Sequence, residues 1–132
     1  MHRWASAFLL VELLVGSPSY ASEPIQTTVC ELIANPSKFD HMEVSIRGRV
    51  FAGVEVTNIS DAPCSGAIQL TVSEDFYHHR DIRSFWTGIR SHRMHATATV
   101  VGRFQMKVPV YPFPMPAIDV HLVRRVIYKR AD

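Results

Sequence analysis

The sequence lacks the short motifs that identify many enzymes. It contains no glycine-rich phosphate loop and no Cys-x-x-Cys pair. The Ser65-Gly66 step lacks the strand–turn–helix setting of a nucleophile elbow. Glu74, Asp75 and Asp81 gather near one predicted helix start, where the helix dipole accounts for acidic residues without catalysis. We therefore expect a non-catalytic protein without a cofactor. The alternative is an enzyme whose site is assembled from positions far apart in the sequence.

The sequence also has little net charge. The formal charge of +2, with histidine neutral, is too small to indicate nucleic acid or an anionic membrane as a partner. Charged residues make up 20% and hydrophobic residues 47%, which is ordinary for a globular protein. A chain of 132 residues has room for one domain.

The apolar run near the N-terminus is too short to span a bilayer, which needs about 20 residues, and it carries Glu12. With Arg3 before it and a small-x-small site after it, residues 1–21 have the organisation of a secretory signal peptide. We therefore expect a single mature domain over residues 22–132, exported to the periplasm or secreted, with no membrane span after cleavage. A buried N-terminal helix of a cytosolic protein is the alternative interpretation.

Only two cysteines are present, Cys30 and Cys64, and both lie in the expected mature domain. In an oxidising compartment two such thiols usually form one disulfide. Closing this loop is worth roughly 3–4 kcal/mol in the chain-entropy model. A redox pair is the alternative, but catalytic thiols normally lie close together in sequence.

Hydrophobic periodicity and turn residues divide the rest of the chain into short elements. We expect a mobile leader over 24–28, a helix over 29–34, a connector over 36–42, strands over 44–50, 54–59 and 67–72, a helix over 73–90 with Ser73 as its N-cap, a strand over 93–105, a proline-rich loop over 107–116, and a strand over 118–128. Gly48 and Gly102, each inside a strand pattern, predict bulges or sharp bends.

This order, with a helix between the third and fourth of five strands, is that of an OB-fold, a partly open Greek-key barrel. In its leader, in the segments 44–50 and 99–103, and in the turn at Cys64, the chain resembles small exported bacterial proteins with OB-like barrels. The resemblance implies a mainly β fold and an extracytoplasmic compartment, and it implies no catalytic residues. Ile82, Phe85, Trp86 and Ile89 form one apolar helical stripe that we expect to face the barrel.

Histidines are the only candidate metal ligands. His78 and His79 lie in the predicted second helix, and His92 and His95 lie where that helix gives way to a strand. Zinc requires three or four ligands that converge on one point. We therefore expect separate surface histidines, and we keep a periplasmic metal- or small-ligand-binding protein as the alternative function.

The proline-rich loop is the candidate binding edge. Tyr111 and Phe113 stand between prolines that restrict the loop before binding, and Arg47 and Arg49 are expected on the outward face of the first long strand. We expect a small binding or accessory module whose partner is an envelope protein or another extracytoplasmic ligand. Nucleic acid is not expected, because export removes the protein from most of it. A loop that merely packs onto the barrel is the alternative.

The expected export has a direct test. If the leader is removed, the protein recovered from its native host will begin at Ser22, and its intact mass will be that of residues 22–132. A full-length product in the cytosol would contradict the signal-peptide interpretation.

Overall fold

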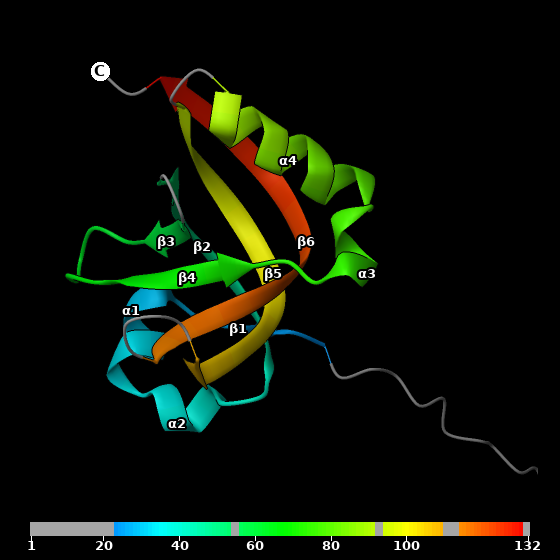
Figure 1. Ribbon diagram of the computed structural model, residues 1–132. Coiled ribbons are helices and arrows are strands. Elements are labelled where there is room, and N and C mark those ends of the chain that lie inside the picture. The colour runs from blue at the N-terminus through cyan, green and yellow to red at the C-terminus, as the bar shows by residue number, and fades with distance from the viewer. Residues whose placement is uncertain (1–22, 54–55, 92–93, 110–113, 131–132) are drawn as a thin grey trace, which may run out of the picture.

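The computed structural model describes residues 23–53, 56–91, 94–109 and 114–130 (Figure 1). The expected leader over 1–21 lies outside them. The described elements are β1 (Ile25–Gln26), α1 (Val29–Ala34), α2 (Pro36–Phe39), β2 (Glu43–Ala52), β3 (Thr57–Ser60), β4 (Ala67–Thr71), α3 (Glu74–Tyr77), α4 (Arg80–Arg90), β5 (Met94–Val108) and β6 (Met115–Arg130). No helix in this part of the chain is long and apolar enough to cross a membrane.

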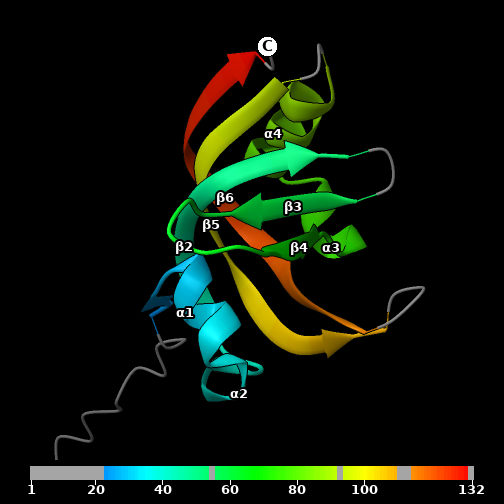
Figure 2. The ribbon, with the colours of Figure 1, turned by 90° about the vertical axis from the view of Figure 1, so that its left-hand side faces the viewer.

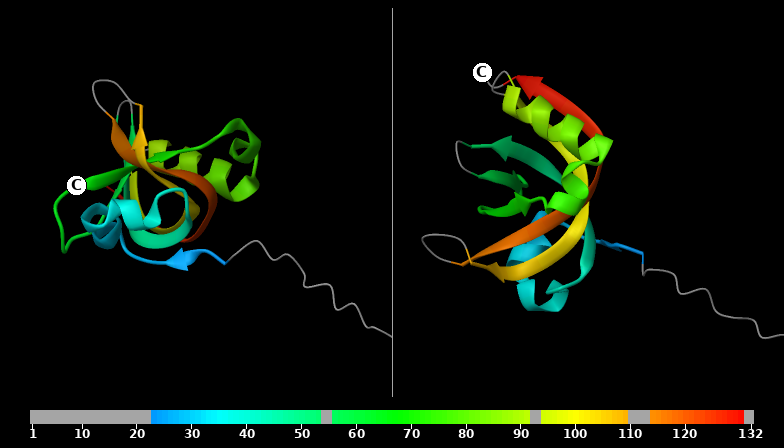
Figure 3. Two further views of the ribbon diagram at one scale, coloured as in Figure 1. Left: turned by 90° about the horizontal axis from the view of Figure 1, so that it is seen from below. Right: turned by 45° about the vertical axis from the view of Figure 1, so that its right-hand side comes forward.

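The strands form one sheet that closes on itself. Their order is β1-β2-β3-β4-β6-β5, and a further antiparallel pairing of β2 with β5 joins the sheet into a ring. β1 with β2 and β4 with β6 pair in parallel, and the remaining neighbours are antiparallel. Figure 3 shows from two further sides how β5 and β6 curve along this ring. The expected mainly β fold is confirmed.

The core fills the inside of the closed sheet. It is made by the inward side chains of the strands together with α1 and α4, and its largest fully buried members are Leu32, Ile46, Ile59, Ile68, Ile82, Phe85, Ile89, Phe104 and Ile118. In Figures 1 and 2 the α1–α2 pair and α4 lie toward opposite ends of the long β5–β6 pair. The helices therefore cover the two ends of the sheet and leave much of its outer side open.

Three expected boundaries were wrong. The supposed leader over 24–28 contains β1, because Ile25 and Gln26 pair with β2 and the Thr27 N–H donates to the carbonyl of Ser45 at 3.1 Å. The connector over 36–42 contains α2, which begins at Pro36, a residue suited to a first helical turn. The loop expected over 107–116 is shorter, since β5 continues to Val108 and β6 begins at Met115.

The expected helix over 73–90 is two helices. His79 has an extended backbone, with φ −65° and ψ 134°, and separates α3 from α4. The break lets Phe76 of α3 stack on the His121 ring of β6, with ring centroids 4.2 Å apart. The stacking of Phe76 on His121 outweighs the helical periodicity of this segment. Ser73 is the N-cap of α3, but its side chain makes no capping hydrogen bond.

The apolar stripe of α4 was predicted correctly. Ile82, Phe85, Trp86 and Ile89 are all buried, and the helix packs against β2, β5 and β6. Their spacing places all four on one helix face, and their burial shows that this face packs on the sheet, beside which α4 lies in Figure 1.

Gly48 and Gly102 are required for close packing. A Cβ on Gly48 would lie 2.7 Å from the carbonyl oxygen of Ser60. β2 pairs with β5 in unbroken register through this position, so of the two expected alternatives, a bulge or a sharp bend, the bulge was wrong. A Cβ on Gly102 would overlap the Asp119 carbonyl, and here the β5–β6 register does shift. Each glycine lets a neighbouring backbone approach where no side chain fits.

The β5–β6 pairing has three register shifts, and at two of them the extra residue lies on β6. Val101 pairs with Leu122 and Gly102 with Val120, so His121 is an extra residue on β6. The next shift, between Thr97 and Thr99, includes Arg125, whose φ of 54° lies in the left-handed region. Bulges of this kind redirect side chains and free backbone groups from the ladder.

The predicted disulfide joins Cys30 to Cys64, with Cα atoms 5.7 Å apart. It connects α1 to the turn between β3 and β4. Such bonds are typical of proteins that fold in oxidising compartments.

Replacing both cysteines, Cys30→Ser with Cys64→Ser, should lower the free energy of unfolding by about 2–5 kcal/mol, because the unfolded chain regains the freedom of a 34-residue loop. Denaturant titration measures the loss, and reduced wild-type protein is the matched control. The expectation fails if the double variant unfolds at the same denaturant concentration as the oxidised wild type.

Candidate functional site

The outward side chains of β2, β5 and β6 form a regular grid. Ile46, Gly48 and Val50 of β2 are buried, so the residues that alternate with them point outward. The antiparallel register places these residues in three rows across the three strands: Arg47, Thr99 and Arg124; Arg49, Thr97 and Ile127; Phe51, His95 and Lys129. We call these nine side chains the basic face.

The basic face gathers positive charge that the composition of the chain does not reveal. It contains Arg47, Arg49, Arg124 and Lys129 and no aspartate or glutamate. Within the described part of the chain, no ion pair joins a carboxylate to any of these residues. Two large apolar side chains stand among the cations, with Phe51 53% and Ile127 54% exposed. The surface is therefore cationic and partly apolar at once.

Arg47 is held in place at one end of the basic face. Its Nη1 donates to Thr99 Oγ1 at 3.0 Å and to the Arg125 carbonyl at 3.1 Å. That carbonyl belongs to the irregular stretch of β6, where the ladder leaves backbone groups free. Because Nη1 carries two hydrogens, these bonds occupy it fully, and Nε and Nη2 remain as a fork of donors. The guanidinium is thus oriented before any ligand arrives.

The expected positions of Arg47 and Arg49 on the outward face are confirmed. Tyr111 and Phe113 lie outside the described residues, so their part in binding stays a prediction. Val108 and Met115, which flank that loop, pair at one end of the β5–β6 hairpin, whereas Arg49 pairs with Thr97 near the other end. The structure therefore does not place the flanks of the loop beside the two arginines.

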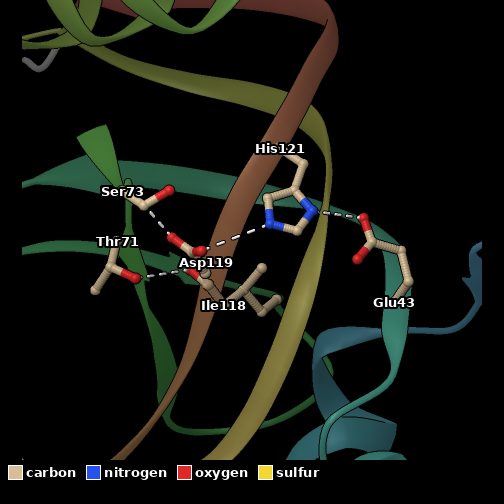
Figure 4. Close-up of polar contacts among 6 residues, drawn as sticks. All are labelled: Glu43, Thr71, Ser73, Ile118, Asp119 and His121. Carbon is tan, nitrogen blue, oxygen red and sulfur yellow. Dashed lines mark hydrogen bonds and ion pairs between the residues drawn. The ribbon is translucent and has the colours of Figure 1, made fainter. Parts of the chain in front are cut away.

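A second polar cluster surrounds His121 (Figure 4). Its Nδ1 lies 2.9 Å from Glu43 Oε1, and its Nε2 lies 3.5 Å from Asp119 Oδ2. Asp119 Oδ1 accepts the backbone N–H of Ser73 at 3.1 Å. On the other side, the ring stacks on Phe76. The cluster joins β2, β6 and the start of α3, three segments far apart in the sequence.

The His121 cluster is built to hold segments together. Each ring nitrogen faces a carboxylate of the chain, one on β2 and one on β6, so the imidazole links the two strands. This cluster was not predicted from the sequence, because Glu43 and His121 are 78 residues apart. The signal present in the sequence was the polar pair Asp119 and His121 within the otherwise apolar stretch 117–123 of β6.

The three candidate histidines that the structure describes, His78, His79 and His95, do not form a metal site. His78 closes α3 and lies 3.3 Å from an Arg83 nitrogen, while His79 packs edge-on against Phe76. His95 belongs to the basic face, on the side of the sheet away from α4, and His92 lies outside the described residues. In the ranges that the structure covers, no three His, Cys, Asp or Glu side chains are placed to hold a metal ion.

A shallow groove runs between α4 and the end of β6. Its lining includes His78, Arg80 and Arg83 from the helices and Tyr128 from β6. Burial raises the pKa of the Tyr128 hydroxyl above its ordinary value, so this side chain is neutral at physiological pH. Arg80 and Arg83 are the charged residues of α4 in this lining, and no carboxylate belongs to it. The nearby Asp81 instead accepts the backbone N–H of Val123 at 2.9 Å. The groove therefore carries fewer cations than the basic face.

Comparison with known proteins gives no family for this chain. No family model matches it, and no curated protein matches it. Among solved structures it is similar to the hypothetical protein ygiW from E. coli, with 17% sequence identity, a TM-score of 0.42, and coverage of 78% of this chain and 97% of that one. A likeness at this level identifies neither a ligand nor an activity.

Replacing Asp119 should destabilise the protein without touching the basic face. Asp119→Ala removes the acceptor of the Ser73 N–H and one partner of His121, and we expect a loss of about 1–3 kcal/mol. Asp75→Ala, an exposed aspartate on α3, is the matched control and should change stability by about 0.5 kcal/mol or less. Urea unfolding measures both, and equal midpoints for the two variants would show that the cluster is not structural.

Proposed function

We propose that this chain is an exported, non-catalytic binding module that takes an anionic ligand on the basic face. The observation that carries the proposal is the grid itself: four cationic side chains and no carboxylate in three adjacent rows. Residues two apart on a strand are separated by about 6.8 Å. Like charges at such spacing repel one another, and an anion between them relieves the repulsion.

The apolar members support contact with more than a bare ion. Phe51 and Ile127 stand on the same face as the cations and are more than half exposed. Aromatic side chains in such positions bury a large area at a small cost in conformational entropy. The ligand that we infer therefore carries negative groups on an uncharged framework, which rests on these two side chains.

The compartment and the finer fold belong to the same proposal. We infer a periplasmic or secreted location from the signal-like residues 1–21, and the Cys30–Cys64 bond supports it. We also infer that β2 to β6 form an OB-fold-like barrel, to which β1 adds a sixth strand. A basic face with an exposed aromatic residue also suits single-stranded nucleic acid, but export leaves an extracytoplasmic anion or an anionic envelope component as the partner.

The proposal is tested by charge reversal with inorganic polyphosphate as the probe. Arg49→Glu with Lys129→Glu should weaken binding by about tenfold or more, equivalent to about 1.4 kcal/mol. The two glutamates introduced in place of cations repel the anionic probe. Arg83→Glu with Arg90→Glu on α4 makes the same charge change elsewhere and should have a much smaller effect. Binding should also weaken as salt concentration rises.

Fluorescence anisotropy of labelled polyphosphate measures the affinities, and thermal melting confirms that each variant is folded. Equal losses in the two double variants would mean that only net charge matters, and the proposal would be wrong. Absence of binding by the wild type would contradict it as well.

A further inference from the structure

We infer that Arg47 and Arg124, at one end of the basic face, form together with the adjoining Arg125 a defined seat for a phosphate monoester group, in the pocket that these three arginines line. The inference rests on the proposed function and names the chemistry that this face recognises. The same pocket is lined by Gln26 and Thr27 of the β1 segment and by Thr99 of β5. Four separate stretches of the chain therefore meet around the three arginines.

The charge of the pocket favours a dianion. Among its lining residues three are arginines and none is acidic. A carboxylate would balance one of these charges, whereas a phosphate monoester carries up to two negative charges and offers three oxygens to donors. Arginine forks match such oxygens in pairs, which a lysine ammonium cannot do.

Arg47 is prepared for this role by its own hydrogen bonds. Both of its bonds to the protein run through Nη1, so the Nε–Nη2 edge is the one left for a ligand. The side chain is half-buried, in contrast to the exposed Arg49 two residues further along the strand. An oriented and partly desolvated guanidinium binds an oxyanion with less loss of side-chain freedom than an exposed one.

Arg125 contributes through an unusual backbone. Its φ of 54° lies in the left-handed region, which residues other than glycine seldom adopt. Arg125 falls in the register shift of β6 and is not paired with β5. Arg124 and Arg125 both line the pocket, and the Arg125 carbonyl accepts a hydrogen bond from Arg47 Nη1. A non-glycine residue held in this conformation is a common sign of a functional position.

The decisive comparison is Arg47→Lys against Arg49→Lys. Both keep the charge, both lie on β2 of the basic face, and only Arg47 lines the pocket. Isothermal titration with inorganic phosphate and with glycerol 3-phosphate, and sedimentation with phosphatidylcholine vesicles with or without phosphatidic acid, identify the source of the phosphate group. We expect Arg47→Lys to weaken the binding of whichever probe binds by about tenfold or more, and Arg49→Lys to change it less than twofold.

A second variant guards against a folding defect in the first. Arg125→Asn removes one charge while keeping a residue that tolerates positive φ, and it should also weaken phosphate binding severalfold with little change in melting temperature. Binding of free phosphate, of the ester or of the phosphatidic acid vesicles alone supports the seat and names its source. The inference is overturned if none of these probes binds, or if Arg47→Lys and Arg49→Lys behave alike.

The two proposals fail in different ways. If the wild type binds polyphosphate through Arg49 and Lys129 but binds no phosphate monoester, the basic face stands and the seat does not. If polyphosphate does not bind either, the proposed function is itself wrong.

Discussion

The antiparallel pairing of β2 with β5 is the constraint on which the rest of this structure depends. It runs in unbroken register from Glu43 and Arg103 to Phe51 and His95, and it turns a row of strands into a ring. Because side chains alternate along a strand, this one register decides which of them enter the core. A shift by a single residue would bring Arg47 inside and expel its apolar neighbours. The grid of cations outside and the core inside are two results of the same pairing.

The irregular positions of β6 add what a regular ladder cannot supply. At His121 the extra residue brings an imidazole against carboxylates of two strands and against the helix that precedes α4. At Arg125 the distorted backbone provides a carbonyl to a side chain two strands away. The first position fastens the ring to its helical cover, and the second shapes the surface where we place the ligand. Both positions depend on a local departure from regular pairing, the first for stability and the second for the surface of the proposed site.

Sequence reasoning found the elements whose cause is local. The alternation around Ile46 and the apolar stripe through Trp86 each act over a few residues, and each was recognised. The break at His79, the strand at Ile25 and the basic face depend on partners far away in the chain. A net charge of +2 gave no sign that four cations would share one face, since charge becomes local only when strands are placed side by side.

Gly48 and Gly102 restrict how the sequence of this protein can change during evolution. Neither Gly48 nor Gly102 can accept even a methyl group without moving a neighbouring backbone. A homologue with a larger residue at either place would have to move a neighbouring strand, so we expect glycine at both places wherever this ring is retained. The two glycines, each set within an apolar–polar alternation and separated by a helical segment, form a pattern that can be searched for directly. This pattern should still be recognisable in homologues whose overall sequence similarity is too low to detect.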